Sequence, residues 1–255
     1  MKTSKYDLMI WDEVEELIKQ GFSSRAISEA YGIPKSTIND RMKHVRQPEV
    51  KLPKVLFTDA ETAPDISATF GRYDVNLTGD HVLEEGGWLI SVSWSWMHED
   101  RVHGSVLTPA EALMRNDYRL VEMIRELINE ADIVVGHNIA RFDLPIYKAR
   151  MVINELKPIS AVRVIDTLKI AKKMKFNSNK LSELAKYLNC SNKMKNSGIS
   201  LWIGCLKGNK DSLNTMLEYN IQDVVVLREI YFKLAPWNSG MPAWGVITRA
   251  EEPLS

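Results

Sequence analysis

The sequence predicts an α/β domain preceded by a small all-helical unit. From about residue 54 onward, short apolar runs alternate with longer segments of helical periodicity, which is the pattern of strands alternating with helices. Before residue 48 there are three helical segments and no strand-like run. We therefore predict a helical domain at 1–47, a linker at 48–53 with two prolines, an α/β domain at 54–236 and a C-terminal tail at 237–255.

The composition is that of a soluble globular protein. It is 45% hydrophobic and 26% charged, and no apolar run is long enough to cross a bilayer. Two cysteines, Cys190 and Cys205, are too few for a disulfide framework or a zinc site. We expect a cytoplasmic protein with reduced thiols and no membrane partner. The 33 basic and 33 acidic residues cancel, which argues against a protein that coats nucleic acid by charge alone.

The first domain contains three predicted helices, at about 11–19, 24–31 and 36–45, separated by Gly21 and by the turn Gly32-Ile33-Pro34. The segment SSRAISEAYGIPKSTINDRMKHVRQ resembles the helix-turn-helix of resolvases and small phage regulators. The matching positions are Ile27, Gly32, Ile33 and Ile38, whose spacing packs two helices across the turn. Ser28 replaces the small alanine usual before the turn.

The third of these helices is basic. Lys35, Arg41, Lys43 and Arg46 face only one acid, Asp40. This charge suits a helix that lies against phosphates. The alternative is a three-helix adaptor that binds another protein. No base-reading side chain is identified.

The second domain alternates strands and helices in a definite order. Strands are predicted at about 54–59, 88–96, 101–107, 132–136 and 162–165, and helices at about 109–130 with a break near Asn116, 143–155, 166–173, 181–188 and 211–234. We expect the loop between the first two strands, with Pro64, Gly71 and Gly79, to hold a substrate-facing hairpin. Three strands, helix, strand, helix, strand, helix is the order of the ribonuclease H-like fold.

Two carboxylates follow the first apolar run, in Val55-Leu56-Phe57-Thr58-Asp59-Ala60-Glu61. Side chains of a strand alternate between faces, so Asp59 and Glu61 lie on the same face. Two acids on one side of a buried strand are costly unless they are neutralised. A divalent cation would neutralise them, because hard cations bind carboxylate oxygens. The alternative is a strand end whose acids meet water.

Two further acids lie at helix positions. Asp143 follows a buried strand and precedes Leu144-Pro145, which also suits an N-cap. Tyr219 and Asp223 are four residues apart, so they share one face of the last helix. Beyond Asp223 this helix is apolar, and an isolated acid there would be expensive without a cation. The alternative for this pair is an ordinary polar helix face.

Together, Asp59-x-Glu61, Gly136-His137-Asn138-(x)3-Phe142-Asp143 and Tyr219-(x)3-Asp223 resemble the three exonuclease motifs of the DEDD superfamily. The resemblance extends over about 54–236. It is nearest to the exonuclease domain of family B DNA polymerases and its stand-alone phage and bacterial relatives. No histidine lies in the last helix, since the five are at 44, 81, 98, 103 and 137. The chain therefore resembles the branch that uses a tyrosine.

The resemblance implies hydrolysis of 3′-terminal phosphodiester bonds of DNA with two divalent cations, Mg²⁺ or Mn²⁺. It implies that Asp59, Glu61, Asp143 and Asp223 bind the cations and that Tyr219 orients the attacking water. Asn138, Phe142 and Thr62 would contact the substrate. Asp166 is interpreted as a helix cap and His137 as structural. Two alternatives stay open, a DNA-binding regulator or adaptor with an inactive nuclease fold, and an enzyme that trims RNA.

Overall fold

The computed structural model describes residues 8–45, 52–71, 73, 75–191 and 198–237. The predicted linker residues 48–51, Arg46 and the tail beyond residue 237 lie outside this part of the chain. The chain divides into two compact units, residues 1–52 and 53–255, and each is described by itself. No helix among the described residues is long and apolar enough to cross a membrane.

The N-terminal unit is a three-helix bundle, α1 (Leu8–Lys19), α2 (Ser24–Tyr31) and α3 (Lys35–Val45). Ser23 caps α2 by accepting a hydrogen bond from the amide of Ala26. Gly32 ends α2 with φ 63°, a left-handed conformation that glycine adopts without strain. The buried side chains are Val14, Ile18, Ile27, Ile33, Ile38 and Met42. Ile27, Ile33 and Ile38 therefore pack the helices across the turn, as their spacing predicts.

The second unit is built on a five-stranded mixed sheet of order β5-β4-β1-β6-β7. Its strands are β1 (Val55–Thr62), β4 (Leu89–Trp96), β5 (His103–Val106), β6 (Ile133–Gly136) and β7 (Arg163–Asp166). β1 is antiparallel to β4 and parallel to β6, and β6 is parallel to β7. The carboxyl ends of β1, β6 and β7 therefore lie at the same end of the sheet. A separate two-stranded sheet joins β2 (Ile66–Ser67) and β3 (Val82–Glu84).

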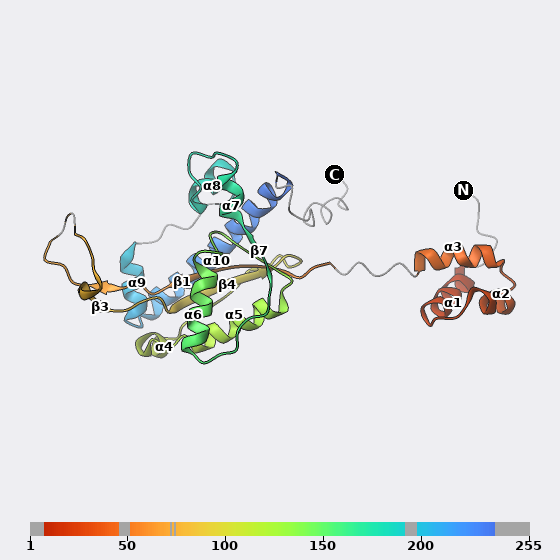
Figure 1. Cartoon of the computed structure of the whole chain (residues 1–255), viewed down its shortest axis with the longest axis horizontal. Helices are drawn as coiled ribbons and strands as arrows, with labels where there is room; N and C mark the ends of the chain where they lie inside the picture. Colours follow the sequence, from red (N-terminus) through yellow and green to blue (C-terminus); the bar gives the residue numbers. More distant parts are fainter. Residues whose placement is uncertain (1–7, 46–51, 72, 74, 192–197, 238–255) are drawn as a thin grey trace. The chain divides into compact units, whose positions relative to one another are not determined.

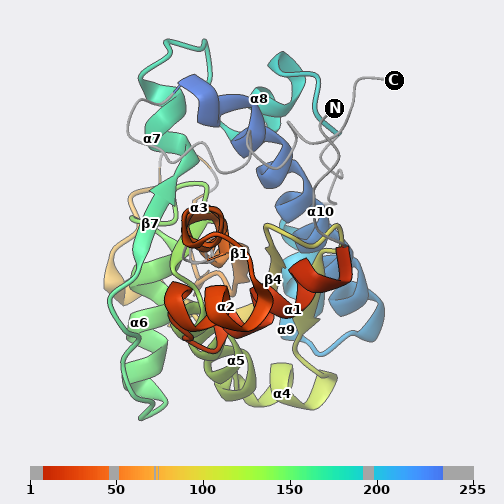
Figure 2. The same cartoon turned by 90° about the vertical axis from the view of Figure 1, so that its right-hand side faces the viewer.

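Helices cover both faces of the five-stranded sheet (Figures 1 and 2). They are α4 (Pro109–Met114), α5 (Tyr118–Glu130), α6 (Asp143–Ile153), α7 (Thr167–Lys172), α8 (Leu181–Tyr187), α9 (Ile199–Leu206) and α10 (Lys210–Leu234). The long helix α10 packs against β1, β4 and β5 on one face, while α5 packs against β4 on the other. This mixed sheet between helices confirms the predicted ribonuclease H-like fold with its N-terminal helices.

A face of small side chains lets α10 lie close to the sheet. Ser91, Ser93 and Ser95 of β4 are all buried, and they are opposite Glu61, Asp59 and Phe57 in the β1–β4 register. Residues opposite one another share a face, and Phe57 meets the ring of Tyr231 on α10 at 5.0 Å between centroids. At Gly104 of β5, a Cβ atom would lie 2.7 Å from Leu217 of α10. The small side chains of β4 and the glycine of β5 therefore allow the close approach of α10 to the sheet.

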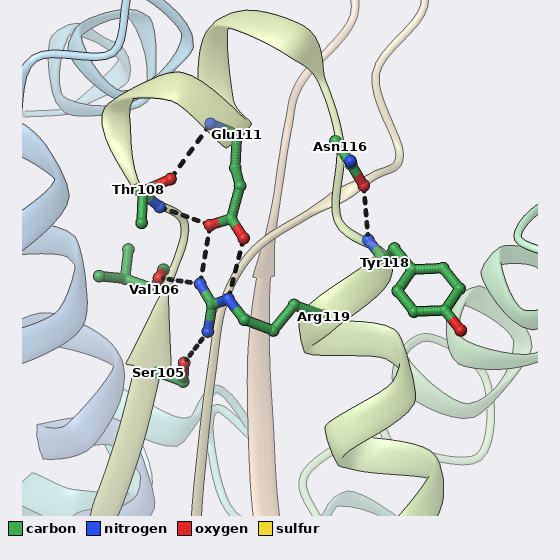
Figure 3. Close-up of polar contacts among 7 residues, drawn as sticks. All are labelled: Ser105, Val106, Thr108, Glu111, Asn116, Tyr118 and Arg119. Atoms are coloured by element: carbon green, nitrogen blue, oxygen red, sulfur yellow. Dashed lines mark hydrogen bonds and ion pairs between the residues drawn. The ribbon is translucent and has the colours of Figure 1, made fainter.

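A network of hydrogen bonds connects the end of β5 to the two helices that follow it (Figure 3). Arg119 donates from Nε and Nη2 to the two carboxylate oxygens of Glu111, at 2.9 and 2.8 Å. It also donates to Ser105 Oγ and to the carbonyl of Val106. The hydrogen bonds from Arg119 hold the pKa of Glu111 low, at about 2. Thr108 and Glu111 form the capping box of α4, so one arginine joins the strand, the cap and α5.

A buried ion pair ties α6 to β4. Asp117 is fully buried and accepts two hydrogen bonds of 2.7 Å from Arg150. It also accepts hydrogen bonds from Asn154 Nδ2 at 3.0 Å and from the amide of Leu89 at 2.9 Å. A buried carboxylate is tolerated when its lone pairs are satisfied in this way. The pair fixes α6, whose first residue is Asp143.

The observed elements differ from the predicted ones at a few places. β1 continues to Thr62, and the predicted break in the helix after residue 109 separates α4 from α5 at residues 115–117. Helix α9 was not predicted. It is apolar except for Ser200 and contains Gly204, at which a Cβ atom would lie 2.1 Å from Ser212 Oγ. A short apolar segment with a glycine carries no helical signal of its own, and its conformation depends on packing against α10.

Candidate active site

Asp59 and Glu61 lie where β1 extends beyond its parallel neighbour. β1 pairs with β6 only over Val55–Phe57, whereas it pairs with β4 to its end. Among the described residues, the carboxyl half of β1 therefore pairs with β4 on one side and with no strand on the other. Asp59 and Glu61 are each half-buried. They share the face that meets α10, as the alternation of side chains along the strand predicts.

Helix α10 brings Asp223 to these two acids. Asp223 is 3% exposed, and one carboxylate oxygen each of Asp59, Glu61 and Asp223 lies within 4.8 Å of the others. Three carboxylates at this separation repel one another. A divalent cation removes this repulsion, and an all-oxygen donor set fits a hard cation such as Mg²⁺ or Mn²⁺. These three predicted ligands are thus brought together.

Asp143 is the first residue of α6 and is 4% exposed. The alternative interpretation of Asp143 as an N-cap does not hold, because the N-cap position of α6 is Phe142. The carboxylate of Asp143 instead accepts hydrogen bonds from its own amide and from the amide of Ala60, which lies between Asp59 and Glu61. Burial nevertheless raises the pKa of Asp143 to about 7. Asp143 is outside the group of three oxygens at 4.8 Å, but it is joined to the same strand.

The loop before α6 is fixed by its own hydrogen bonds. Asn138 has φ 68°, a left-handed conformation in which asparagine is favoured among non-glycine residues. Its amide donates to Asp166 Oδ1 at 2.9 Å, and the same oxygen accepts the amide of Leu168 at the start of α7. Asp166 is therefore a helix cap, as predicted, and it also holds this loop. His137 lies 2.9 Å from both Thr167 Oγ1 and the carbonyl of Asn179, which fits the structural role predicted for it.

Tyr219 is one helical turn before Asp223 and is 6% exposed. Its ring meets Trp202 of α9 edge to face, with 6.2 Å between centroids. The unpredicted helix α9 therefore supports the tyrosine. Tyr219 and Asp223 lie on one side of α10, as their spacing predicts.

A family model of the RNase_H superfamily matches residues 87–235, which is more than half of the chain. The chain belongs to the RNase_H superfamily. The matched region includes Asp143, Tyr219 and Asp223, and the strand with Asp59 and Glu61 precedes it. Membership in the RNase_H superfamily supports nuclease activity in general terms.

A solved structure of the family B DNA polymerase from the hyperthermophilic archaeon Pyrobaculum calidifontis is similar to this RNase_H superfamily protein, with a TM-score of 0.55. The sequences are 14% identical, and the similarity covers 73% of this chain and 25% of the polymerase chain. At this identity the similarity shows the fold. The chain spans about a quarter of the polymerase's length. No curated protein matches.

Two of the residues expected to contact the substrate, Thr62 and Phe142, are next to the carboxylates of Glu61 and Asp143 in the sequence. Phe142 is 46% exposed, and Thr62 is half-buried at the end of β1, where the register with β4 shifts. Beside Asn138 there is a hollow of 440 Å³, lined by His137, Asn138, Leu168, Lys172, Asn179, Lys180 and Leu181. Two of its lining side chains are lysines, which suits a polyanion.

One residue of the site was not predicted from the sequence. Asn220 is fully buried, and its Nδ2 donates to Asp59 Oδ2 at 2.8 Å. Its position directly after Tyr219 in the motif was the available signal. Tyr147 is a second buried neighbour, because both Asp143 and Asp59 act on it electrostatically. Burial raises the pKa of Tyr147 well above its ordinary value, so its hydroxyl stays neutral.

In the N-terminal unit, the predicted phosphate contacts differ in their surroundings. Lys35 is exposed, and Lys43 is exposed and lies 3.1 Å from Asp40. Arg41 donates from Nε to Glu15 of α1 at 2.6 Å, and its guanidinium lies 5.6 Å from the centre of the Trp11 ring. Arg41 thus holds α3 to α1 through a charge pair and a cation–π contact. Arg46 lies outside the described residues.

Proposed function

We propose that this protein is a 3′–5′ exonuclease that hydrolyses phosphodiester bonds of single-stranded DNA with two divalent cations. The approach of Asp59, Glu61 and Asp223 to within 4.8 Å is the observation that carries the proposal. Asp143, joined to the same strand through the amide of Ala60, would be the fourth ligand. The position of Tyr219 on α10, one helical turn before Asp223, and the exonuclease motifs in the sequence support this proposal.

Asp59 would contact both cations, Glu61 and Asp223 would hold the first, and Asp143 would hold the second. Bound there, the cations would activate a water and stabilise charge on the attacking and leaving oxygens. Mg²⁺ and Mn²⁺ suit these ligands, because zinc usually requires histidine or cysteine. The three-carboxylate group contains neither of those residue types.

The remaining side chains would place the substrate. The hydroxyl of Tyr219 would orient the attacking water, and the edge contact with Trp202 limits the ring's movement. Phe142, nearly half exposed, would stack on a terminal base, since every base offers a flat apolar face. Asn138 and Thr62 would hold the terminal nucleotide. Lys172 and Lys180, on the wall of the hollow beside Asn138, would face the backbone phosphates.

Digestion of end-labelled single-stranded DNA with the full-length protein and Mg²⁺ or Mn²⁺ tests this proposal. We expect 5′-labelled DNA to shorten progressively and 3′-labelled DNA to release labelled mononucleotide at once. The same DNA incubated with EDTA should stay intact. Internal cuts, release from the 5′ end or cleavage without metal would contradict the proposal. An equal-length RNA in parallel decides between a deoxyribonuclease and an RNA-trimming enzyme.

We further propose that the N-terminal unit is a helix-turn-helix that binds nucleic acid through α3. A double Lys35→Ala, Lys43→Ala variant should bind DNA more weakly, and the slope of log K against log salt should fall by about 2, one for each phosphate contact. Fluorescence anisotropy with labelled duplex in EDTA measures both effects. Lys19→Ala, which removes an exposed lysine of α1, is the matched control. An unchanged slope in the double variant would favour the protein-binding adaptor.

A further inference from the structure

Asn220 connects the sheet to the first carboxylate of the site. Its side chain is fully buried between β4 and α10. Nδ2 donates to Asp59 Oδ2 at 2.8 Å, and Oδ1 accepts from Ser91 Oγ at 3.2 Å. Both ends of the amide are therefore engaged, one with β1 and the other with β4.

The chemistry of the partners fixes which way the amide points. An ionised carboxylate only accepts hydrogen bonds, so the NH₂ group must face Asp59 and the carbonyl must face a donor. Ser91 supplies that donor through its hydroxyl. A reversed amide would place its carbonyl oxygen against the carboxylate and would lose the hydrogen bond to Asp59. Asn220 therefore has one favoured orientation, which the carboxylate of Asp59 selects and the hydroxyl of Ser91 supports.

An amide is well suited to hold a metal ligand. A lysine or arginine at this place would cancel the charge of Asp59 and compete with a cation for it. The neutral Nδ2–H group orients the carboxylate and leaves its charge available.

We propose that Asn220 is a positioning residue that holds Asp59 in the orientation in which it binds the divalent cations, with Ser91 acting through Asn220. This inference rests on the proposed metal site, because it assigns a role to the residue behind one of its ligands. The hydrogen bonds that carry it come from side chains of three different elements, β1, β4 and α10. Asn220 is not expected to touch the substrate or the reacting atoms.

The test is a titration of the protein with Mn²⁺, in which electron paramagnetic resonance measures the concentration of unbound Mn²⁺. We expect Asn220→Ala to weaken Mn²⁺ binding roughly 10- to 100-fold, the range found when a group behind a metal ligand is removed. Ser91→Ala should weaken it roughly threefold, the effect of one hydrogen bond. The double variant should be no weaker than Asn220→Ala alone. In turnover, kcat at low Mn²⁺ should fall, KM for DNA should stay unchanged, and excess Mn²⁺ should restore kcat.

Asn154→Ala is the matched control. Asn154 Nδ2 also donates to a buried carboxylate, that of Asp117 in the ion pair with Arg150. Its removal should lower the melting temperature without changing Mn²⁺ affinity. If Asn220→Ala does not fold, the Mn²⁺ affinity of Ser91→Ala tests the inference instead. A wild-type affinity in Ser91→Ala would then overturn it.

A comparison with Asp59→Ala separates this inference from the proposed function. If Asp59→Ala loses Mn²⁺ binding and folded Asn220→Ala keeps it, the positioning role fails while the metal site stands. If Asp59→Ala binds Mn²⁺ as the wild type does, the proposed metal site itself fails.

Discussion

Replacing Asp59 with alanine is expected to lower the rate of DNA cleavage at least about a thousandfold, which corresponds to about 4 kcal/mol of lost transition-state stabilisation. Asp59 is the ligand proposed to contact both cations, and it lies in the group of three carboxylates with Glu61 and Asp223. Single-turnover digestion of 5′-labelled DNA at saturating Mn²⁺ measures the effect. Asp211→Ala, which removes an exposed acid from the N-terminal end of α10, should cleave at the wild-type rate.

The folded state is expected to tolerate this change. Without metal, Asp59 is repelled by Glu61 and Asp223, so its removal relieves repulsion. The hydrogen bond from Asn220 is lost, which offsets part of this gain. Circular dichroism in EDTA should therefore show a melting temperature near that of the wild type. A cleavage rate within tenfold of wild type, in a variant that melts normally, would remove Asp59 from the proposed centre.

Local patterns in the sequence were sufficient to predict most of the fold. The order of strands and helices follows from apolar periodicity, and the common face of Asp59 and Glu61 follows from the alternation of side chains along a strand. The same-face placement of Tyr219 and Asp223 follows from helical spacing. These features each depend on a few neighbouring residues, which is why they could be predicted without knowledge of the tertiary structure.

Features that depend on distant pairing could not be predicted in the same way. Asp143 resembled an N-cap because a cap is the common local role for aspartate before Leu-Pro. Its actual partner is the amide of Ala60, in the part of β1 that extends beyond the pairing with β6. The contact between Asn220 and Asp59 spans 161 residues of sequence. Only the tertiary structure brings such pairs together.

Arg41 illustrates the same limit in the N-terminal unit. A count of charges along the predicted third helix treats its four basic residues as equal phosphate contacts. Arg41 instead pairs with Glu15, 26 residues earlier in the chain. Much of its role is therefore to hold α3 on α1, and the proposal of nucleic-acid binding depends chiefly on the exposed lysines.

Replacing Asp143 with asparagine is expected to stabilise the metal-free protein at pH 8 while reducing cleavage by orders of magnitude. Burial raises the pKa of Asp143 from 3.8 to about 7. At pH 8 the folded protein must carry a buried carboxylate that the unfolded chain exposes to water. Each pKa unit is worth about 1.4 kcal/mol, so this ionisation costs up to about 4 kcal/mol of stability. Asparagine avoids this cost, but it removes a proposed ligand of the second cation.

The contribution of Asp143 to the free energy of unfolding should decrease as the pH rises. Between pH 3.8 and 7 the folded state binds the proton more tightly than the unfolded state, so the Asp143 contribution to stability is present at low pH and is lost as the pH rises through about 7. The stability gap between Asp143→Asn and wild type should thus be large at pH 8 and should shrink towards pH 4. Urea denaturation in EDTA at several pH values measures it, with Asp211→Asn as the exposed control.

In EDTA at pH 8, Asp143→Asn is expected to be more stable than the wild type, and added Mn²⁺ should make the wild type the more stable protein. A cation that binds only the folded protein stabilises it by mass action, and the wild type has the full set of proposed ligands. The variant should gain less stability because one carboxylate is missing. If both proteins are equally stable at every pH in EDTA, ionisation of Asp143 does not lower the free energy of unfolding, which would contradict the prediction. An equal gain from Mn²⁺ would exclude Asp143 from metal binding, because a ligand cannot be removed without reducing the affinity that it supplies.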